Sequence, residues 1–237
     1  MFSNSTVVLT GVGAEGQVGE VVAKAFADQG ASLVLVDRTA DHVNARADAL
    51  KKAGADARGY ACDLTDAGAV DTLVKDVRAN HGDKLRAFVH MAGGFAMSGP
   101  VADSAIDVWH RQIAINLTTA YLAARAFLPL LRADNGSLVF FASEAALPGA
   151  SAANRSAYAV AKSGVVTLMR AIAAEEAKAR TGVRANAVAP TSIRTAANLR
   201  DMGGDVRYVE REEVAAAVVY LCSPEASAVT GAVIPLS

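Results

Sequence analysis

Short runs of apolar, often β-branched residues alternate with longer segments of helical periodicity along the whole chain. The short runs predict strands at Thr6–Thr10, Ser32–Asp37, Ala57–Ala61, Ala87–His90, Ser137–Ala142, Arg184–Ala189 and Ala232–Ile234. The intervening segments predict helices near 18–29, 40–53, 66–80, 107–132, 156–180 and 210–221. Strands that are apolar almost throughout, with helices between them, are typical of a parallel sheet covered on both faces. The alternation therefore predicts an α/β fold with a doubly wound parallel sheet of about seven strands. No linker or repeat interrupts it, so residues 1–237 are expected to form a single domain.

Composition and charge argue against several classes of protein. The net charge is −1 and no block of like charges occurs, so no nucleic-acid partner is expected. Cys62 and Cys222 form no spacing motif, which argues against a disulfide framework or a metal site and favours a cytoplasmic location. The N-terminus has no basic leader, and no unbroken apolar run reaches the ~18 residues of a membrane span. No membrane partner is therefore expected.

A glycine-rich segment, TGVGAEGQVG, follows the first predicted strand and precedes the first predicted helix. Ligands of doubly wound sheets bind at the carboxyl ends of the strands. A turn of this kind, in the order strand, loop and helix, brings backbone N–H groups to a pyrophosphate at the positive end of the helix. The segment predicts a dinucleotide site, and the alternative is a glycine-rich connection that binds nothing.

Charged residues follow the second and third predicted strands. Asp37 ends the second strand, where a carboxylate accepts hydrogen bonds from the adenosine ribose and repels a 2′-phosphate, which favours NAD. The neighbouring Arg38 favours the opposite preference, because a guanidinium pairs with that phosphate or stacks on adenine. Asp37 would equally suit a helix cap. Asp63, after the third strand, suits either the adenine amino group or a cap.

The fourth strand ends at His90 and is followed by Met91-Ala92-Gly93-Gly94, whose glycines permit a flat ligand to approach closely. No carboxylate lies near His90 in the sequence, so we expect no chemical role for it. Asn116 lies among aliphatic residues in the middle of a predicted helix, and its amide needs a partner. We expect Asn116 to distort that helix locally or to hold a water.

Tyr158 and Lys162 lie four residues apart in SAYAVAKSG, on one face of a predicted helix. A free phenol titrates near pH ~10, and a nearby positive charge lowers that pKa. Such a phenol exchanges a proton with a carbonyl or alcohol oxygen near neutral pH. By itself the pair would also suit an ordinary surface helix. Ser143, at the end of the fifth strand, is expected at the same edge of the sheet.

Taken in chain order, these residues resemble the single-domain branch of the short-chain dehydrogenase/reductase family, from Val7 to about Leu236. The resemblance rests on the TG-initiated loop, Asp37, Asp63-Leu64, MAGG where the family often has NNAG, Asn116, Ser143, Tyr158 with Lys162, Pro190-Thr191 and the final VTGAVIPLS. It implies a Rossmann-like fold and an NAD(P)-dependent oxidoreductase that interconverts a secondary alcohol and a ketone.

The resemblance also implies roles for individual residues. Tyr158 exchanges the proton with the substrate oxygen, and Ser143 hydrogen-bonds that oxygen and stabilises developing charge. Lys162 lowers the pKa of the phenol and holds the nicotinamide ribose, while Asn116 holds a water that links Lys162 to solvent. The implied cofactor-binding residues are Gly11, Gly13, Gly16, Gln17, Val18, Asp37, Arg38, Asp63, Leu64, Ala92, Gly93, Tyr158, Lys162, Pro190, Thr191 and Ile193.

Two departures from the family pattern bear on the site. The glycine-rich turn is two residues longer than usual, and Gln17 stands where the middle glycine would fall, so its side chain either crowds the pyrophosphate or donates a hydrogen bond to it. The gap between Ser143 and Tyr158 is also two residues longer. Residues 194–209 are expected to form a mobile lid, with Gly203-Gly204 as hinge candidates.

The sequence therefore predicts an NAD(H)-dependent enzyme acting on a small-molecule alcohol or ketone. Phe95, Met97, Leu147, Asn154 and Met202 are the expected walls of a mostly apolar substrate pocket. A homo-oligomer, a tetramer or a dimer, is expected from pairing of the helices at 107–132 and 156–180. The alternatives are a 3-oxoacyl thioester reductase that uses NADPH and a dinucleotide-binding sensor or scaffold without turnover.

Overall fold

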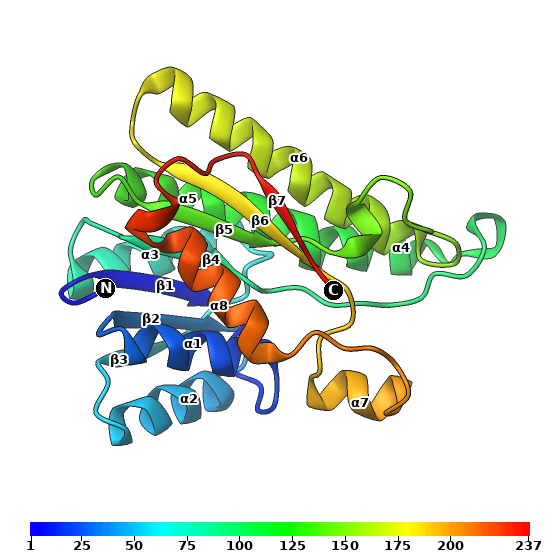
Figure 1. Ribbon diagram of the computed structural model, residues 1–237, viewed down its shortest axis with the longest axis horizontal. Coiled ribbons are helices and arrows are strands. Elements are labelled where there is room, and N and C mark those ends of the chain that lie inside the picture. Colours follow the sequence, from blue (N-terminus) through cyan, green and yellow to red (C-terminus); the bar gives the residue numbers. More distant parts are fainter.

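Seven parallel strands form one sheet in the order β3-β2-β1-β4-β5-β6-β7 in the computed structural model, which describes residues 1–237 (Figure 1). The strands are β1 (Thr6–Thr10), β2 (Ser32–Asp37), β3 (Ala57–Ala61), β4 (Ala87–His90), β5 (Ser137–Phe141), β6 (Arg184–Pro190) and β7 (Val233–Leu236). The strand order reverses between β1 and β4. The carboxyl ends of these two neighbours therefore flank the crevice where ligands of such sheets bind.

Helices cover both faces of the sheet. They are α1 (Val18–Asp28), α2 (Ala40–Lys52), α3 (Ala67–His81), α4 (Ile106–Gln112), α5 (Thr119–Arg132), α6 (Ser156–Ala179), α7 (Ala196–Met202) and α8 (Arg211–Cys222). A π-helical turn at Ile113–Thr118 joins α4 to α5, and short 3-10 turns lie at Val101–Asp103, Glu144–Ala146 and Pro224–Ala226.

Alternate residues of each strand enter two separate hydrophobic cores, one on each face of the sheet. On one face Phe88 packs with Phe127 of α5 and Met169 of α6. On the other face Val89 belongs to the core that contains Phe26 of α1 and Leu221 of α8. Because both faces are buried, the strands read as continuous apolar runs in the sequence.

The predicted fold class is confirmed, and the predicted strands agree with the observed ones to within two residues at each end. The predicted helix at 107–132 is wrong as a single α-helix, because the π-helical turn divides it. The short helix α7 was not predicted as a helix; it lies in the stretch expected to be a lid, beyond the carboxyl ends of the strands (Figure 1).

Two helical stretches, Ile106–Arg132 and Ser156–Ala179, are long and apolar enough to cross a membrane by length and composition alone. In the most apolar window of each, 39% and 50% of the residues are buried inside the protein. Both stretches supply residues to the core over one face of the sheet. Core helices meet the same criterion, so these two stretches carry no argument for a membrane.

Candidate active site

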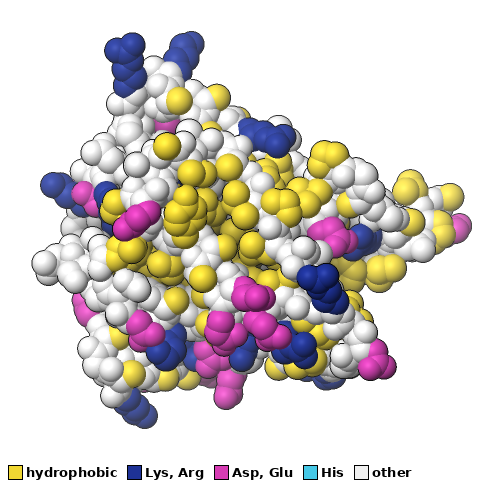
Figure 2. All heavy atoms as spheres, in the orientation of Figure 1, with side chains coloured by type: hydrophobic (Ala, Val, Ile, Leu, Met, Phe, Trp, Pro, Cys, Tyr) yellow, Lys and Arg dark blue, Asp and Glu magenta, His cyan; other side chains and the backbone are white.

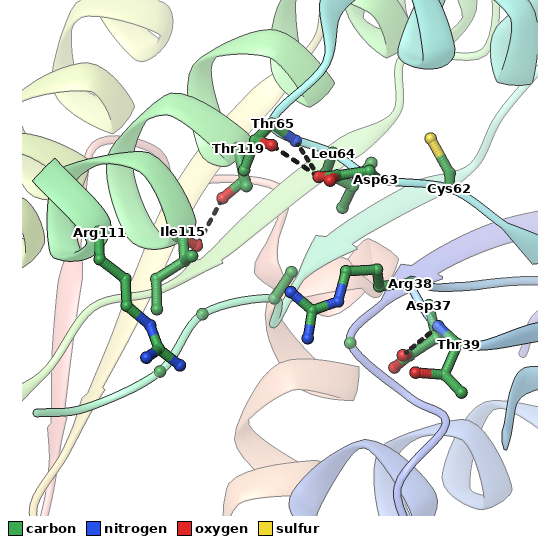
Figure 3. A pocket seen from close by; sticks show the side chains of 14 residues that line it. Asp37, Arg38, Thr39, Cys62, Asp63, Leu64, Thr65, Arg111, Ile115 and Thr119 are labelled. Atoms are coloured by element: carbon green, nitrogen blue, oxygen red, sulfur yellow. Dashed lines mark hydrogen bonds between the residues drawn. The ribbon is translucent and has the colours of Figure 1, made fainter.

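Two cavities lie at the carboxyl edge of the sheet and share Gly93 and Gly94. The first, of about 300 Å³, lies beyond β1, β2 and β3 (Figure 3) and is lined by Gly11, Asp37, Arg38, Thr39, Cys62, Asp63, Leu64, Thr65, Ala92, Gly93, Gly94, Arg111, Ile115 and Thr119. The second, of about 210 Å³, lies beyond β4, β5 and β6 and is lined by Met91, Gly93, Gly94, Phe95, Phe141, Ala142, Ser143, Tyr158, Lys162, Pro190, Thr191, Ile193 and Asn198.

The glycine-rich loop presents unpaired backbone donors at the start of α1. Gly11 and Gly16 have φ of 74° and 70°, a region that a side chain disfavours. Gln17 is the N-cap of α1 in an extended conformation, and its side chain makes no capping bond. The amides of Gln17, Val18 and Gly19 donate to no acceptor on the protein. Three free N–H groups at the positive end of a helix fit a pyrophosphate.

An ion-pair cluster holds the lengthened part of this loop. Glu20 accepts hydrogen bonds from the Gly16 N–H at 2.9 Å and from Arg46 at 2.8 Å, and Arg211 lies 3.7 Å away. Burial raises the pKa of Glu20, but the bonds from Gly16 and Arg46 outweigh it and hold that pKa below its ordinary value. Arg46 also donates to the Val12 carbonyl. The longer turn is thus tied to both α1 and α2.

Asp37 is fixed at the end of β2 with its carboxylate beside the glycine loop. One carboxylate oxygen accepts the Gly13 N–H at 2.9 Å, and the other accepts the Thr39 N–H at 3.3 Å. A Cβ on Gly13 would lie 2.9 Å from the Asp37 carboxyl carbon, so this close approach requires a glycine. The N-cap of α2 is Thr39, which leaves Asp37 as a residue of the cavity.

Two arginines point into the first cavity from opposite sides, Arg38 after β2 and Arg111 on α4 (Figure 3). Asp63 accepts two hydrogen bonds from Thr65, which lower its pKa, and the charge of Arg38 lowers that pKa further. The cap of α3 is Asp66, which accepts the Ala69 N–H. The capping alternative for Asp63 is therefore wrong.

His90 is a neutral structural residue. Its Nδ1 lies 3.1 Å from the Thr10 hydroxyl and its Nε2 lies 3.3 Å from that of Thr119. Because Thr119 donates to the Ile115 carbonyl, Nε2 carries the proton and Nδ1 accepts from Thr10. Burial lowers the pKa of His90 to about 3. The ring joins β1, β4 and α5 and lines neither cavity.

Asn116 lies in the π-helical turn, as the expected local distortion requires. Its Nδ2 donates to the Gly94 carbonyl at 2.9 Å, and its Oδ1 accepts the Gly94 N–H at 3.2 Å. The buried Gln112 also accepts from Nδ2, at 3.1 Å. A Cβ on Gly93 would lie 2.5 Å from the Asn116 Oδ1. Asn116 therefore holds the segment after β4 against the helix.

Ser143, Tyr158 and Lys162 converge on the second cavity. The buried Lys162 donates to the Phe141 carbonyl at 2.8 Å, and burial lowers the pKa of Lys162 to about 8. Burial raises the pKa of Tyr158, and a hydrogen bond with Ser143 and the charge of Arg155 offset that rise in part.

The expected lowering of the Tyr158 pKa by Lys162 is wrong for this structure. The Lys162 ammonium donates to the β5 carbonyl rather than to the phenol, and it lies 5.9 Å from the centre of the Tyr158 ring.

The two cavities bring together most of the residues that the sequence singled out. Of the predicted catalytic and cofactor-binding residues, five line neither cavity: Gly13, Gly16, Gln17, Val18 and Asn116. Of the five expected walls of the substrate pocket, only Phe95 lines the second cavity, and Met97, Leu147, Asn154 and Met202 do not. Sequence reasoning missed Arg111, Ile115 and Thr119, although they recur every four residues on the helix that carries Asn116. It also missed Thr39 and Thr65, which follow Asp37 and Asp63 by two residues, and Asn198, which carried no signal.

Comparisons with known proteins place the chain among reductases and dehydrogenases. A family model described as enoyl-(acyl carrier protein) reductase matches residues 11–237. The chain is 32% identical to meso-2,3-butanediol dehydrogenase from Serratia marcescens (99% of this chain, 94% of the relative) and 32% identical to 2-(S)-hydroxypropyl-CoM dehydrogenase 3 from Xanthobacter autotrophicus (98% and 94%). A solved short-chain type dehydrogenase/reductase from Mycobacterium ulcerans superposes with a TM-score of 0.87 at 31% identity, covering 99% of this chain and 88% of that one.

Proposed function

The chain belongs to the short-chain dehydrogenase/reductase family and interconverts a secondary alcohol and a ketone with a nicotinamide dinucleotide, and we propose that its dinucleotide is NAD(H) and its proton donor is Tyr158. The observation that carries the proposal is that the two cavities adjoin at Gly93 and Gly94, which line both. One cavity holds the Asp37 carboxylate, and the other holds Ser143, Tyr158 and Lys162.

The residues present fit an extended dinucleotide. The first cavity offers Asp37 for the adenosine ribose and Asp63 and Leu64 for adenine, and the free N–H groups of Gln17, Val18 and Gly19 suit the pyrophosphate. Pro190, Thr191 and Ile193 line the second cavity, where the nicotinamide would lie. When bound, the nicotinamide ring donates or accepts the hydride.

The protein's own groups would handle the proton. Tyr158 gives its phenolic proton to the oxygen of a ketone, or accepts the proton of an alcohol, while Ser143 hydrogen-bonds the same oxygen and stabilises the charge that develops on it. Lys162 has a pKa of about 8, so near neutral pH it is largely a cation, which would hold the hydroxyls of the nicotinamide ribose. Asn116 fixes the loop that forms the wall beside Lys162, because Gly93 lies against both side chains.

The preference for NAD(H) follows from the placement of Asp37. Two backbone N–H groups fix its carboxylate in the cavity that would receive the adenosine ribose. A 2′-phosphate there would face this carboxylate. Arg38 would favour NADPH instead, because a guanidinium pairs with a 2′-phosphate. Its charge also acts on Asp63, whose pKa it lowers.

A fluorescence titration with NADH and separately with NADPH tests this preference. We expect the native protein to bind NADH more tightly than NADPH. Asp37→Ser should narrow or reverse this difference in affinity because it removes the carboxylate that repels the 2′-phosphate. Arg38→Ser serves as the matched control, since loss of this residue should weaken NADPH rather than NADH. Tighter binding of NADPH by the native protein would refute the NAD(H) assignment and favour the 3-oxoacyl thioester reductase.

Tyr158→Phe tests the proton donor. We expect turnover to fall by at least ~100-fold, the usual contribution of general acid catalysis, while NADH binding survives. Tyr60→Phe removes a hydroxyl that contacts His81 and lines neither cavity, and it should leave turnover unchanged. Native turnover by Tyr158→Phe would remove the proton-transfer role. Loss of Tyr158 and Lys162 without any functional consequence would instead favour the sensor or scaffold.

A further inference from the structure

Exposed apolar side chains are concentrated in two segments, each of which supplies one residue to the second cavity. Of the eleven large hydrophobic residues exposed on the protein, five lie between residues 95 and 109 and two lie on α7: Phe95, Met97, Val101, Ile106, Trp109, Leu199 and Met202. Residues 95–109, here named the outer arm, project beyond the carboxyl ends of the strands, with α7 across from them (Figure 1). Apolar side chains are prominent on this right-hand projection in Figure 2.

The apolar surface begins at the phenol itself. Phe95 lines the second cavity, and its ring stands edge-to-face with that of Tyr158 at 5.0 Å between centres and an angle of 87°. On the opposite side Asn198 lines the cavity and donates to the Ile193 carbonyl at 2.8 Å, which fixes the start of α7. Met202 then returns to Ser192, with 3.7 Å between its sulfur and the hydroxyl. Phe95 beside the phenol and Met202 beside Ser192 therefore place exposed apolar side chains on two sides of the second cavity.

Hydrogen bonds hold both of these sides. The Asn154 carbonyl accepts from the Ser98 N–H at 2.8 Å, the Gly99 N–H at 3.1 Å and the Ser98 hydroxyl at 3.2 Å. These bonds join the outer arm to the longer loop between Ser143 and Tyr158. The Tyr208 hydroxyl donates to the Gly203 carbonyl at 2.6 Å and closes the end of α7. Hydrogen bonds therefore fix the backbone of both segments that carry the exposed apolar residues.

The arginines beside the cavity are paired within the protein. Arg155, whose charge acts on Tyr158, lies 3.4 Å from Glu144. Arg194, which follows the cavity residue Ile193, lies 2.6 Å from Glu210. A carboxylate or phosphate on the substrate would therefore find both of these arginines already paired, and against the exposed apolar side chains it would incur a desolvation cost.

We infer, resting on the proposed function, that the substrate is an uncharged secondary alcohol or ketone with an extended apolar substituent. That substituent lies against Phe95 and between the outer arm and α7, while the oxygen faces Ser143 and Tyr158. Coenzyme A thioesters, hydroxy acids and short polyols fit this mouth less well. Phe95 and Met202 determine the specificity.

A series of methyl ketones from butanone to decanone, reduced with NADH, tests the inference. Each added methylene that leaves water should raise kcat/KM about two- to fourfold, until the chain extends beyond the outer arm. Phe95→Ser and Met202→Gln should flatten this dependence on chain length. Tyr220→Ala truncates an equally exposed aromatic side chain on α8, away from both cavities, and should keep the native gradient.

The outcomes separate the inference from the proposed function. A flat or falling series, or faster reduction of 3-oxobutanoate, a 3-oxoacyl thioester of coenzyme A or a short polyol's ketone, would overturn the apolar substrate while keeping the enzyme. An unchanged gradient in both Phe95→Ser and Met202→Gln would overturn the placement of the substituent along the outer arm. If no compound of any class is reduced while NADH still binds, the proposed function fails and the inference fails with it.

Discussion

Burial of Lys162 places its charge in the second cavity and destabilises the folded protein. Its ammonium is buried, with the Phe141 carbonyl as its one hydrogen-bond acceptor, and burial lowers its pKa from 10.5 to about 8. The protonated form is therefore disfavoured in the folded state relative to the unfolded state. At pH 7 this cost approaches ~3 kcal/mol, since each pKa unit corresponds to about 1.4 kcal/mol. The cost is complete below pH 8 and disappears as pH rises through 10.5.

We expect Lys162→Met to raise the free energy of unfolding at pH 7 and to abolish turnover. Loss of the hydrogen bond to the Phe141 carbonyl costs about 1 kcal/mol, so the net increase in the free energy of unfolding is ~1–2 kcal/mol. The gain should shrink or reverse near pH 10, where native Lys162 folds as the neutral amine. Thermal unfolding of both proteins at pH 7 and pH 10 measures this difference. A gain of equal size at both pH values, or a loss at pH 7, would contradict the assigned cost.

The glycine-rich loop after β1 contacts the first residue of α7. The Gly16 carbonyl accepts the Ala196 N–H at 3.0 Å, and a Cβ on Gly16 would lie 2.8 Å from that of Ala196. The segment expected to be a lid therefore rests on the loop that presents the free N–H groups of α1. Binding at the loop and closure of α7 should be coupled, because one contact serves both.

Gly16→Ala tests this coupling. We expect NADH binding to weaken about fivefold, equivalent to ~1 kcal/mol, and proteolysis within residues 203–207 to accelerate. Gly54→Ala is the matched control, because Gly54 has a similar φ of 89° with no atom within 4 Å of an added Cβ. Both variants carry the strain of a left-handed alanine, so any effect shared by the two belongs to that strain. Equal NADH affinities in the two variants would rule out the coupling.

The sequence predicts the elements well where one physical rule decides them. Apolar strands buried on both faces, with ligand residues at their carboxyl ends, led to Asp37 and Ser143, and the four-residue spacing from Lys162 led to Tyr158. Prediction from the sequence fails where a contact between segments far apart in the chain determines the local structure. Helix α7 begins where the Ala196 N–H donates to the Gly16 carbonyl, a contact that the sequence does not reveal. A distortion at Asn116 was expected, but its π-helical form and its bonds to Gly94 were not. The raised pKa of Tyr158 depends on burial that no spacing rule reveals.

At the scale of the whole molecule, two apolar faces away from the cavities lack a partner. Tyr121 on α5 and Val160 on α6 are 54% and 47% exposed. A second face is a hollow of about 780 Å³ between α1 and α8, lined in part by Val21, Ala215 and Val219. Tetramers with two-fold axes need two different self-complementary faces. We propose that the protein forms a homotetramer through these two faces.

Light scattering at micromolar concentration measures the assembly directly, and we expect about four times the chain mass of 24.3 kDa. Val160→Glu places a charge on the face of α5 and α6, and Ala216→Glu places one in the hollow beside α8; both positions are exposed, so the chain should still fold. Each single variant should give a dimer, because the other face remains intact, and the double variant a monomer. A native monomer, or single variants that keep the native mass, would refute the use of these faces. Because neither face lines a cavity, turnover per chain should survive in the dimers, which separates assembly from chemistry.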